Sequence, residues 1–469
     1  MRLLLPVAVL AALLSPGLPA QASTAAGAGG GASAVTKLTG TFKDGATYLI
    51  QVPANWNGTL FLYSHGYVVP GTNNPATDVG DPVTGGWMLS HGYALAGSSY
   101  AITGWAIQSA LLDQIRTLNV FNQRIGKKPT TTIAWGHSLG GMITAGLAQQ
   151  YPSRFNAALP MCGVVSGGIA TWNTALDAAF AFQQLIDPSV QVVNITNPGT
   201  NLTSALQAAQ AAQKTAAGRA RLALSSALSD TPGWFTPLSA QPGPTAYAAQ
   251  EANQYLWASQ VDYPFAFALR AQLEALAGGN PSWNTGVNYF KDLLKSPSLN
   301  EVLDLYHKAG LSLDADLATL AAAPRVSADP AASTYLRKHI TYDGNLTIPV
   351  LTMHTIGDGL VVPENESAYS GAVAKAGKSA LLRQIFVDRA GHCAFTPAET
   401  ITAAKTLLNR LKTGQWNDGA LTPAQMNTKA AALGPKFNIF SGPNGPVATP
   451  PGFLSYIPAP YLRPFNRKS

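Results

Sequence analysis

The sequence predicts an α/β fold, in which a mostly parallel central sheet is flanked by helices. Three short apolar runs, at residues 131–135, 348–355 and 381–387, have the length and composition of strands that are buried on both faces. The first is followed by a small-residue amphipathic run at 141–146, which predicts a helix. Strands that alternate with helices are typical of parallel sheets.

The turn between the first of these strands and its helix has the pattern G-x-S-x-G, spelled Gly136-His137-Ser138-Leu139-Gly140. A serine on so sharp a turn has a strained backbone, and its flanking positions need glycine because a side chain there would strike the strand or the helix. The pattern also arises by chance in a chain with 44 glycines. The strand before it and the helix after it favour a nucleophile at Ser138 over an ordinary turn serine.

An acid and a histidine follow the other two strands. Asp358 comes after the strand at 348–355, and His392 after the strand at 381–387. Serine, acid and histidine in this chain order are typical of α/β-hydrolases. The chain thus resembles the α/β-hydrolase superfamily, in its esterase and lipase branch, over residues 35–165 and 345–413.

The resemblance implies a catalytic triad. Ser138 would be the nucleophile, His392 the general base and then the general acid, and Asp358 the group that orients the imidazole. Asp388 is a rival acid, but it lies only four residues before His392 and so on the same loop. The alternatives without a catalytic role are a turn aspartate at 358 and a loop histidine at 392.

A predicted strand at 59–64 ends in His65-Gly66-Tyr67, where this superfamily builds half of its oxyanion hole. The resemblance implies that the backbone N–H groups of Tyr67 and Leu139 stabilise the tetrahedral intermediate. The alternative is that His65 and Gly66 only form a tight turn. Two further histidines, His137 and His354, are more typical of structural residues.

The N-terminus predicts export. Residues 1–22 have a single arginine, a short apolar stretch and an Ala20-Gln21-Ala22 cleavage pattern, which together indicate a signal peptide. The apolar stretch is shorter than the roughly 20 residues of a membrane span. Residues 23–34 are rich in alanine and glycine and predict a flexible lead-in. We therefore expect a secreted, extracellular protein without a membrane span.

Composition argues against several other classes of function. The net charge of +7 is spread thinly along the chain, whereas nucleic-acid binding requires a concentrated basic stripe. The sequence has no Cys/His cluster with zinc spacing, no phosphate-binding loop and no dinucleotide fingerprint. It therefore implies no metal and no cofactor.

Two cysteines, Cys162 and Cys393, are predicted to form a disulfide, as is common in secreted proteins. Cys162 follows a predicted strand at 155–161, and Cys393 is the neighbour of His392, so both lie on the catalytic face. The alternative is two unlinked buried cysteines.

The stretch 166–344 is far longer than a simple connection in this fold, and its alanine-rich helical character predicts a cap over the catalytic face. Three cap aromatics, Tyr255, Trp257 and Phe265, are candidates for substrate binding, although each is more often a core residue. They belong to the group Tyr255, Trp257, Tyr263, Phe265 and Phe267. The tail at 414–469, rich in proline and glycine, is expected to pack on the core.

Together these features predict a secreted serine hydrolase that cleaves carboxylic esters through an acyl-enzyme. Its substrate would be a small-molecule, lipid or polymeric ester, and the oligomeric state is left open. A first alternative is a serine aminopeptidase of the same capped fold, in which Glu251 and Asp262 would hold the amino group of the substrate. A second is a binding protein without catalytic activity, which the intact order of triad residues disfavours.

Overall fold

The computed structural model describes residues 34–442 and 445–465. The predicted signal peptide 1–22, and the predicted lead-in up to residue 33, lie outside the described residues. Within them, one large sheet has the order β1-β2-β4-β3-β5-β6-β7-β8-β11. Its strands are β1 (Val35–Thr41), β2 (Thr47–Pro53), β3 (Thr59–Ser64), β4 (Ala94–Ser98), β5 (Thr131–His137), β6 (Ala157–Met161), β7 (Val350–Gly357), β8 (Leu382–Ala390) and β11 (Phe453–Leu454).

The six central strands are parallel to one another; in sheet order they are β4, β3, β5, β6, β7 and β8. By contrast, β1, β2 and β11 pair antiparallel with their neighbours. The side chains of the central strands alternate between the two faces of the sheet, as the pleat requires. In β3, Leu60 and Leu62 join one core cluster, and Phe61 and Tyr63 join the other. Both faces are buried, so the central strands are apolar along their whole length.

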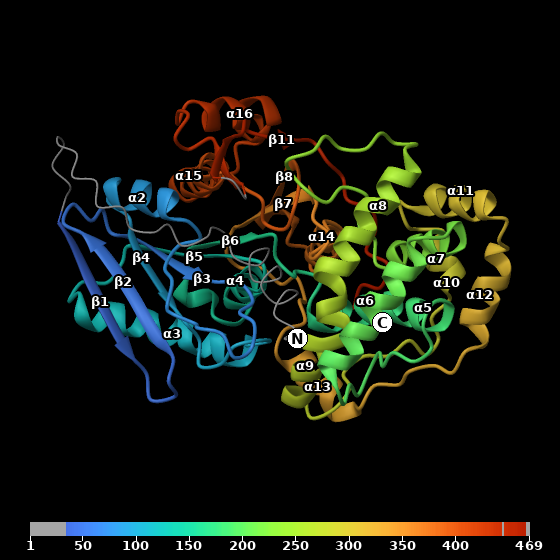
Figure 1. Cartoon of the computed structure of the whole chain (residues 1–469). Coiled ribbons are helices and arrows are strands. Elements are labelled where there is room, and N and C mark those ends of the chain that lie inside the picture. The colour runs from blue at the N-terminus through green and yellow to red at the C-terminus, as the bar shows by residue number, and fades with distance from the viewer. Residues whose placement is uncertain (1–33, 443–444, 466–469) are drawn as a thin grey trace.

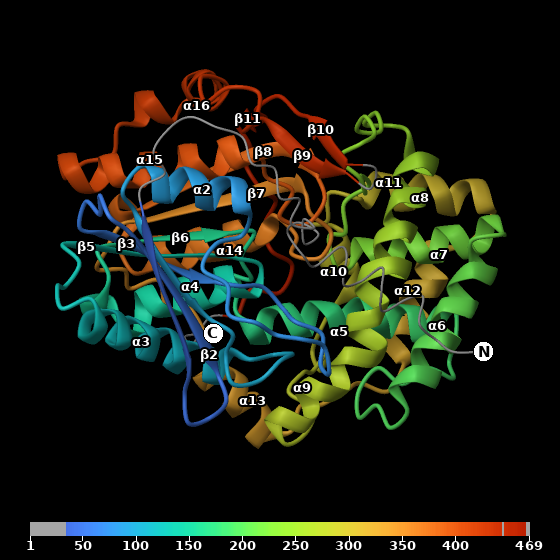
Figure 2. The same ribbon diagram turned by 60° about the vertical axis from the view of Figure 1, so that its left-hand side comes forward.

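Helices cover the two faces of the sheet (Figure 2). One face packs against α3 (Ile107–Arg124), α4 (Leu139–Gln150) and α14 (Glu364–Lys375). The other packs against α2 (Pro82–Ser90), α15 (Pro397–Thr413) and α16 (Pro423–Ala431).

Nine further helices follow β6 and precede β7 in the described chain, and they gather beside one end of the sheet (Figure 1). They are α5 (Gly168–Leu185), α6 (Pro198–Ala212), α7 (Ala216–Ala227), α8 (Tyr247–Trp257), α9 (Arg270–Ala277), α10 (Tyr289–Leu293), α11 (Leu299–Ala309), α12 (Leu313–Ala322) and α13 (Pro330–Lys338). This helical segment has apolar cores of its own, built around Phe180 and Phe182 of α5. We call it the cap.

Two π-helical segments, Ala258–Asp262 and Phe265–Leu269, join α8 to α9. Such segments are rare and are frequent at functional sites. Among the described residues, no helix is long and apolar enough to cross a membrane.

The tail has more regular structure than its composition suggests. It forms α16, a hairpin of β9 (Ile439–Gly442) and β10 (Gly445–Ala448), and β11, which adds an antiparallel edge strand beside β8. It also reaches the cap, because Arg463 Nη1 lies 2.8 Å from Asp177 Oδ2 of α5. The tail therefore contacts the cap as well as the sheet.

Candidate functional site

Ser138 lies on the turn between β5 and α4. Its φ of 59° and ψ of −125° are values that a residue with a side chain rarely adopts, so the turn is strained. The turn is held in part by its own N–H group, which donates to Met161 O at 3.0 Å. A Cβ on Gly136 would come within 2.6 Å of Gly140 O, and one on Gly140 would collide with Ser64 O. Only glycine fits on either side of this serine.

Asp358 follows β7 directly and has no exposed surface. Its Oδ1 accepts hydrogen bonds from the N–H groups of Leu360 and Val361, at 3.1 and 3.0 Å, and its Oδ2 lies 2.7 Å from His392 Nδ1. The carboxylate thus fixes the imidazole with Nδ1 as the donor and leaves Nε2 free to take up a proton. The rival acid, Asp388, is exposed on β8.

Two other histidines close to the site are occupied by structural contacts. His137 Nδ1 lies 3.2 Å from the Tyr63 hydroxyl. Burial, and then the nearby His392, lower the pKa of His137 to about 3, so it is neutral at physiological pH. His354 is fully buried, with Nδ1 at 3.0 Å from Glu366 Oε1 and Nε2 at 2.6 Å from Val361 O.

The predicted oxyanion donors border the same cavity as Ser138. Leu139 is the first residue of α4, so its N–H group has no partner within the helix. Tyr67 follows β3 by three residues and lines the cavity too. Gly66, the neighbour of Tyr67, lies close against the serine, because a Cβ on it would stand only 3.3 Å from Ser138 Cβ.

A disulfide joins Cys162 and Cys393, the pair linked in the sequence analysis. Cys162 comes directly after β6, and Cys393 is next to His392, so the bridge ties the histidine loop to the strand beside the serine turn. Both cysteines have positive φ, 42° and 55°. His392 Nε2 lies 3.4 Å from Cys393 Sγ, and within the described chain Ser138 Oγ makes no hydrogen bond. Catalytic hydrogen bonds often form only once substrate is bound.

The positions of these groups in the sheet decide the fold. Ser138, Asp358 and His392 follow β5, β7 and β8, so all three lie beyond the carboxyl ends of parallel strands, and Asp358 and His392 are in contact there. That placement and chain order are those of a strand–serine turn–helix hydrolase. The chain has the α/β-hydrolase fold.

A cavity lies between the serine turn and the cap. One face of α5 supplies residues at helical spacing, Thr171, Thr174, Ala175 and Ala178. The full lining is Tyr67, Trp105, Ser138, Leu139, Val164, Thr171, Trp172, Thr174, Ala175, Ala178, Ala179, Ser225, Ser226, Ser229, Thr231, Ala258, Asp262, Tyr263, Phe265, Ala266, Gly359, Leu360, Val361, Val362, Asn365 and Tyr461.

Of the three cap aromatics singled out from the sequence, Phe265 lines the cavity. Trp257 does not. Its ring packs against Gly359, and its Nε1 donates to Trp234 O at 3.0 Å. Tyr255 packs at the edge of a cap core instead. The small residues of α5 were missed, although their spacing at i, i+3, i+4 and i+7 is a signal that the sequence carries.

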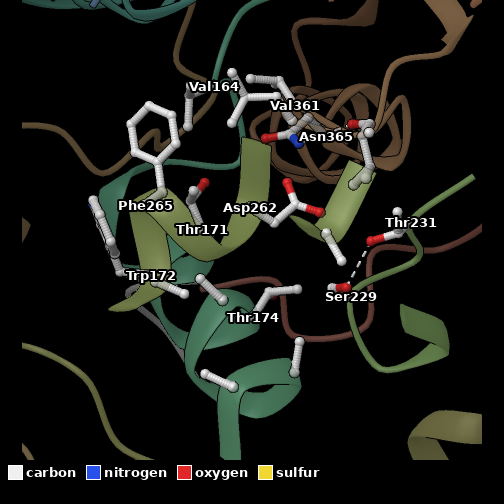
Figure 3. Close-up of a pocket in the computed structure, with 18 of the residues that line it drawn as sticks. Val164, Thr171, Trp172, Thr174, Ser229, Thr231, Asp262, Phe265, Val361 and Asn365 are labelled. Atoms are coloured by element: carbon white, nitrogen blue, oxygen red, sulfur yellow. Dashed lines mark hydrogen bonds between the residues drawn. The ribbon is translucent and has the colours of Figure 1, made fainter. Parts of the chain in front are cut away.

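The two acids of the aminopeptidase alternative have different surroundings. Glu251 is 1% exposed, accepts from Gln213 Nε2 at 3.1 Å, and lies outside the cavity lining. Asp262 ends the first π-helical segment, and Figure 3 shows its carboxylate projecting into the cavity. Among the described residues of the lining, Asp262 is the one acidic or basic side chain of the Asp, Glu, Lys, Arg and His types. Burial, and then the charge of Asp358, raise its pKa.

Several known proteins are similar to this chain, although no protein-family model matches it. It is 28% identical to an o-phthalyl amidase of Xanthobacter agilis over 432 residues, which are 85% of this chain and 92% of the amidase. Among solved structures, it is similar to the cell-wall-degrading esterase LipA of Xanthomonas oryzae, at 14% identity and a TM-score of 0.35 over 75% of this chain and 82% of that one. It is also similar to feruloyl esterase B of Aspergillus oryzae, at 12% identity and a TM-score of 0.38 over 81% of each chain.

Proposed function

We propose that this chain is a secreted serine hydrolase that cleaves carboxylic esters through an acyl-enzyme, with Ser138, His392 and Asp358 as its triad. The contact of 2.7 Å between His392 Nδ1 and the buried Asp358 Oδ2, at the edge of the sheet where the serine turn lies, is the observation that supports this most.

In the proposed reaction, Ser138 Oγ attacks the carbonyl carbon of the ester while His392 Nε2 takes the serine proton. Asp358 stabilises the resulting imidazolium through Nδ1–H. The N–H groups of Leu139 and Tyr67 bind the oxyanion. His392 then gives its proton to the departing alkoxide, and the acyl group stays on Ser138. Water, deprotonated by the same histidine, releases the acid and restores the serine.

The cavity favours uncharged or cationic substrates over anionic ones. Its walls combine apolar side chains with the hydroxyl groups of Thr171, Thr174, Ser226 and other residues, and no lysine or arginine is among the lining residues described. When ionised, Asp262 would repel a carboxylate. We therefore infer that the substrate is a small-molecule ester or a single acyl chain of a lipid.

A second candidate is cleavage of amide bonds by the same triad. The o-phthalyl amidase at 28% identity favours it, as does Asp262, whose carboxylate would attract the amino group of an aminopeptidase substrate. A triad that cleaves amides also cleaves activated esters, because an alkoxide or phenolate leaves more readily than an amine. Ester hydrolysis is therefore expected for either candidate and does not distinguish them. Hydrolysis of the amide substrates does.

The test is a panel of p-nitrophenyl esters with short and long acyl chains, aminoacyl p-nitroanilides, and a phthalyl amide, each assayed with wild type and Ser138→Ala. We expect rapid, Ser138-dependent turnover of the esters and slow turnover of the amides. A higher kcat/KM for either class of amide would replace the ester assignment with the second candidate. Absence of turnover for the whole panel would contradict both.

Secretion has its own test. If residues 1–22 are removed on export, N-terminal sequencing of protein from the culture medium should begin at Ser23. Retention in the cell with Met1 or Arg2 at the N-terminus would contradict the export prediction.

A further inference from the structure

His354 of β7 is a buried histidine that the proposed reaction does not use. It has no exposed surface, and it lies four residues before Asp358, which directly follows this strand. Its Nδ1 is 3.0 Å from Glu366 Oε1 of α14, and its Nε2 is 2.6 Å from Val361 O. The same Nε2 is 3.7 Å from Asp358 Oδ2. His354 therefore lies between two carboxylates, one of which belongs to the proposed triad.

The partners of both ring nitrogens of His354 accept hydrogen bonds and donate none. A backbone carbonyl has no proton to give, so Nε2 carries one. Glu366 Oε2 accepts from Thr352 Oγ1 at 2.6 Å and from Gln384 Nε2 at 2.5 Å. Two such bonds favour the ionised carboxylate, and an ionised carboxylate accepts a proton from Nδ1 as well. A ring that is protonated at both nitrogens is an imidazolium cation.

The charges around the ring also favour the cation. Burial lowers the pKa of His354, but the hydrogen bond and charge of Glu366, with the charge of Asp358 and a backbone carbonyl, outweigh it and raise the pKa. The other titratable groups close to the two carboxylates are His392, Asp262 and Tyr369. Of these, His392 alone can become positive, and in the proposed reaction it does so only transiently. His354 is thus the lasting positive charge beside Asp358 in this part of the described chain.

We propose that His354 is a positioning residue that stays charged in the working enzyme, holds the Asp358 carboxylate toward His392 and balances part of its charge. The inference rests on the proposed triad. Val361 links the two side chains, because its carbonyl accepts from His354 Nε2 and its N–H group donates to Asp358 Oδ1 at 3.0 Å. The cation therefore fixes the loop that fixes the acid. It also attracts Asp358 Oδ2, the atom that contacts His392.

Two consequences distinguish this role from simple packing. Without the cation, the charge of Asp358 is less balanced, so it stabilises the imidazolium of His392 more strongly. The acid limb of the kcat/KM profile, which reports protonation of the base in the free enzyme, should then move to higher pH. A less firmly held Asp358 also orients His392 less well, which should lower kcat more than it raises KM.

The first measurement is the charge of His354 in the full mature chain, and it does not depend on activity. Protein with ¹⁵N-labelled histidine is studied by NMR at pH 8, where an ordinary histidine with a pKa near 6.5 is neutral. A neutral ring has one protonated and one bare nitrogen with well-separated ¹⁵N shifts, whereas the two nitrogens of an imidazolium have similar shifts. We expect one of the seven histidines to be doubly protonated, and its signal to be missing in His354→Gln.

The second measurement is the pH profile of kcat and kcat/KM on a p-nitrophenyl ester. His354→Gln should lower kcat by about 10- to 100-fold, the order of loss expected for a slightly misplaced catalytic group, and should move the acid limb to higher pH. Glu366→Gln removes the charge that keeps the second proton on His354. It should lower kcat at pH 8 and abolish the doubly protonated signal. His307→Gln is the matched control, because His307 is exposed on α11, and it should behave as wild type.

The absence of a doubly protonated histidine from wild type at pH 8 would overturn the proposal, as would a doubly protonated signal that persists in His354→Gln. So would a His354→Gln enzyme with wild-type kcat and an unmoved acid limb. If circular dichroism shows that His354→Gln does not fold, Glu366→Gln asks the same question with the ring in place. A wild type that cleaves no ester or amide would refute the proposed function, and the positioning role with it, whereas the NMR result would still report the charge of His354.

Discussion

His392 Nδ1 and Asp358 Oδ2 are 2.7 Å apart, and the same carboxylate accepts two backbone N–H groups through its other oxygen. Both oxygens of Asp358 are therefore committed, which fixes the plane of the carboxylate and with it the orientation of the imidazole. The orientation of His392 therefore depends both on the negative charge of Asp358 and on the positions of its two acceptor oxygens.

Asp358→Asn is expected to keep the fold and to lower kcat by about 10⁴-fold, because an amide in this place favours the wrong tautomer of His392. The measurement is kcat on a p-nitrophenyl ester, with circular dichroism to verify folding. Asp388→Asn is the matched control and should retain wild-type activity, since Asp388 is exposed. If Asp388→Asn were inactive and Asp358→Asn nearly wild type, the acid would be wrongly assigned.

Ser138→Ala should abolish hydrolysis, with a loss on the order of 10⁴-fold or more in kcat, because no nucleophile remains at the turn. Removing one oxygen leaves the glycines that hold this turn in place, so the Tm should change little. In wild type, a fluorophosphonate should modify Ser138 alone, as mass spectrometry of the adduct would show. Labelling of a different serine, with activity retained in Ser138→Ala, would refute the assignment.

The serine turn and the strand before it were predictable because their signal is local. Gly136 and Gly140 stand within five residues in the G-x-S-x-G pattern, although a Cβ on Gly140 would collide with Ser64 O of the distant strand β3, and the apolar run that precedes them has the length of a buried strand. The order of acid and histidine follows from the order of the strands. The serine turn can be recognised from neighbouring residues in the sequence. The order of acid and histidine can be predicted because the rules for connecting parallel strands leave few possible topologies.

The cavity wall was harder to predict, because it depends on which face of each cap helix turns inward. Trp257 and Phe265 looked equivalent in the sequence, yet Trp257 packs against Gly359 and Phe265 reaches the cavity. The π-helical segments Ala258–Asp262, which lies between these two residues, and Phe265–Leu269 bond i to i+5. The α-helical period of 3.6 residues per turn therefore does not predict which side chains face the cavity there. Small residues such as Thr174 and Ala178 carry no chemical signal of their own.

Stability should fall with acid in a way that depends on His137. Its pKa is about 3 in the folded protein and near 6.5 when unfolded, so below pH 6.5 the unfolded chain binds a proton that the folded chain excludes. The contribution of His137 to stability is complete above pH 6.5 and is lost progressively as the pH falls toward 3, by up to about 1.4 kcal/mol per pH unit.

His137→Gln tests this. The slope of Tm against pH between 6.5 and 4 should be shallower than in wild type, whatever the cost of losing the Tyr63 contact at neutral pH. His91→Gln is the control, because His91 is exposed, and it should keep the wild-type slope. Equal slopes for wild type and His137→Gln would show that His137 is not the group involved.

Reduction of the disulfide should impair activity before it unfolds the sheet. Cys162 and Cys393 are 231 residues apart, and the chain-entropy relation gives about 5 kcal/mol for a closed loop of that size. Because Cys393 adjoins His392, loss of the bridge frees the base first. Ester hydrolysis should fall in dithiothreitol at temperatures where far-ultraviolet circular dichroism is unchanged. Two free thiols in denatured, unreduced protein would contradict the bridge itself.

Asp262→Asn should change which substrates are preferred. Asp262 is the one carboxylic acid among the described lining residues, and its carboxyl group projects into the cavity (Figure 3), whose lining also includes Ser138. An ionised carboxylate attracts a cation in this partly dry setting far more than in water. Wild type should therefore favour an ester ending in trimethylammonium over its tert-butyl isostere by about 10-fold in kcat/KM, which corresponds to about 1.4 kcal/mol.

The preference should also grow as the pH rises. Burial and the charge of Asp358 raise the pKa of Asp262, so the fraction of ionised Asp262, and with it the attraction for a cation, increases with pH. In Asp262→Asn both the preference and its pH dependence should disappear, while the neutral ester is turned over at a similar rate. Glu251→Gln is the matched control, because Glu251 lies outside the lining and should leave the ratio unchanged. A ratio that stays near 10 in Asp262→Asn would show that this carboxylate does not select the substrate.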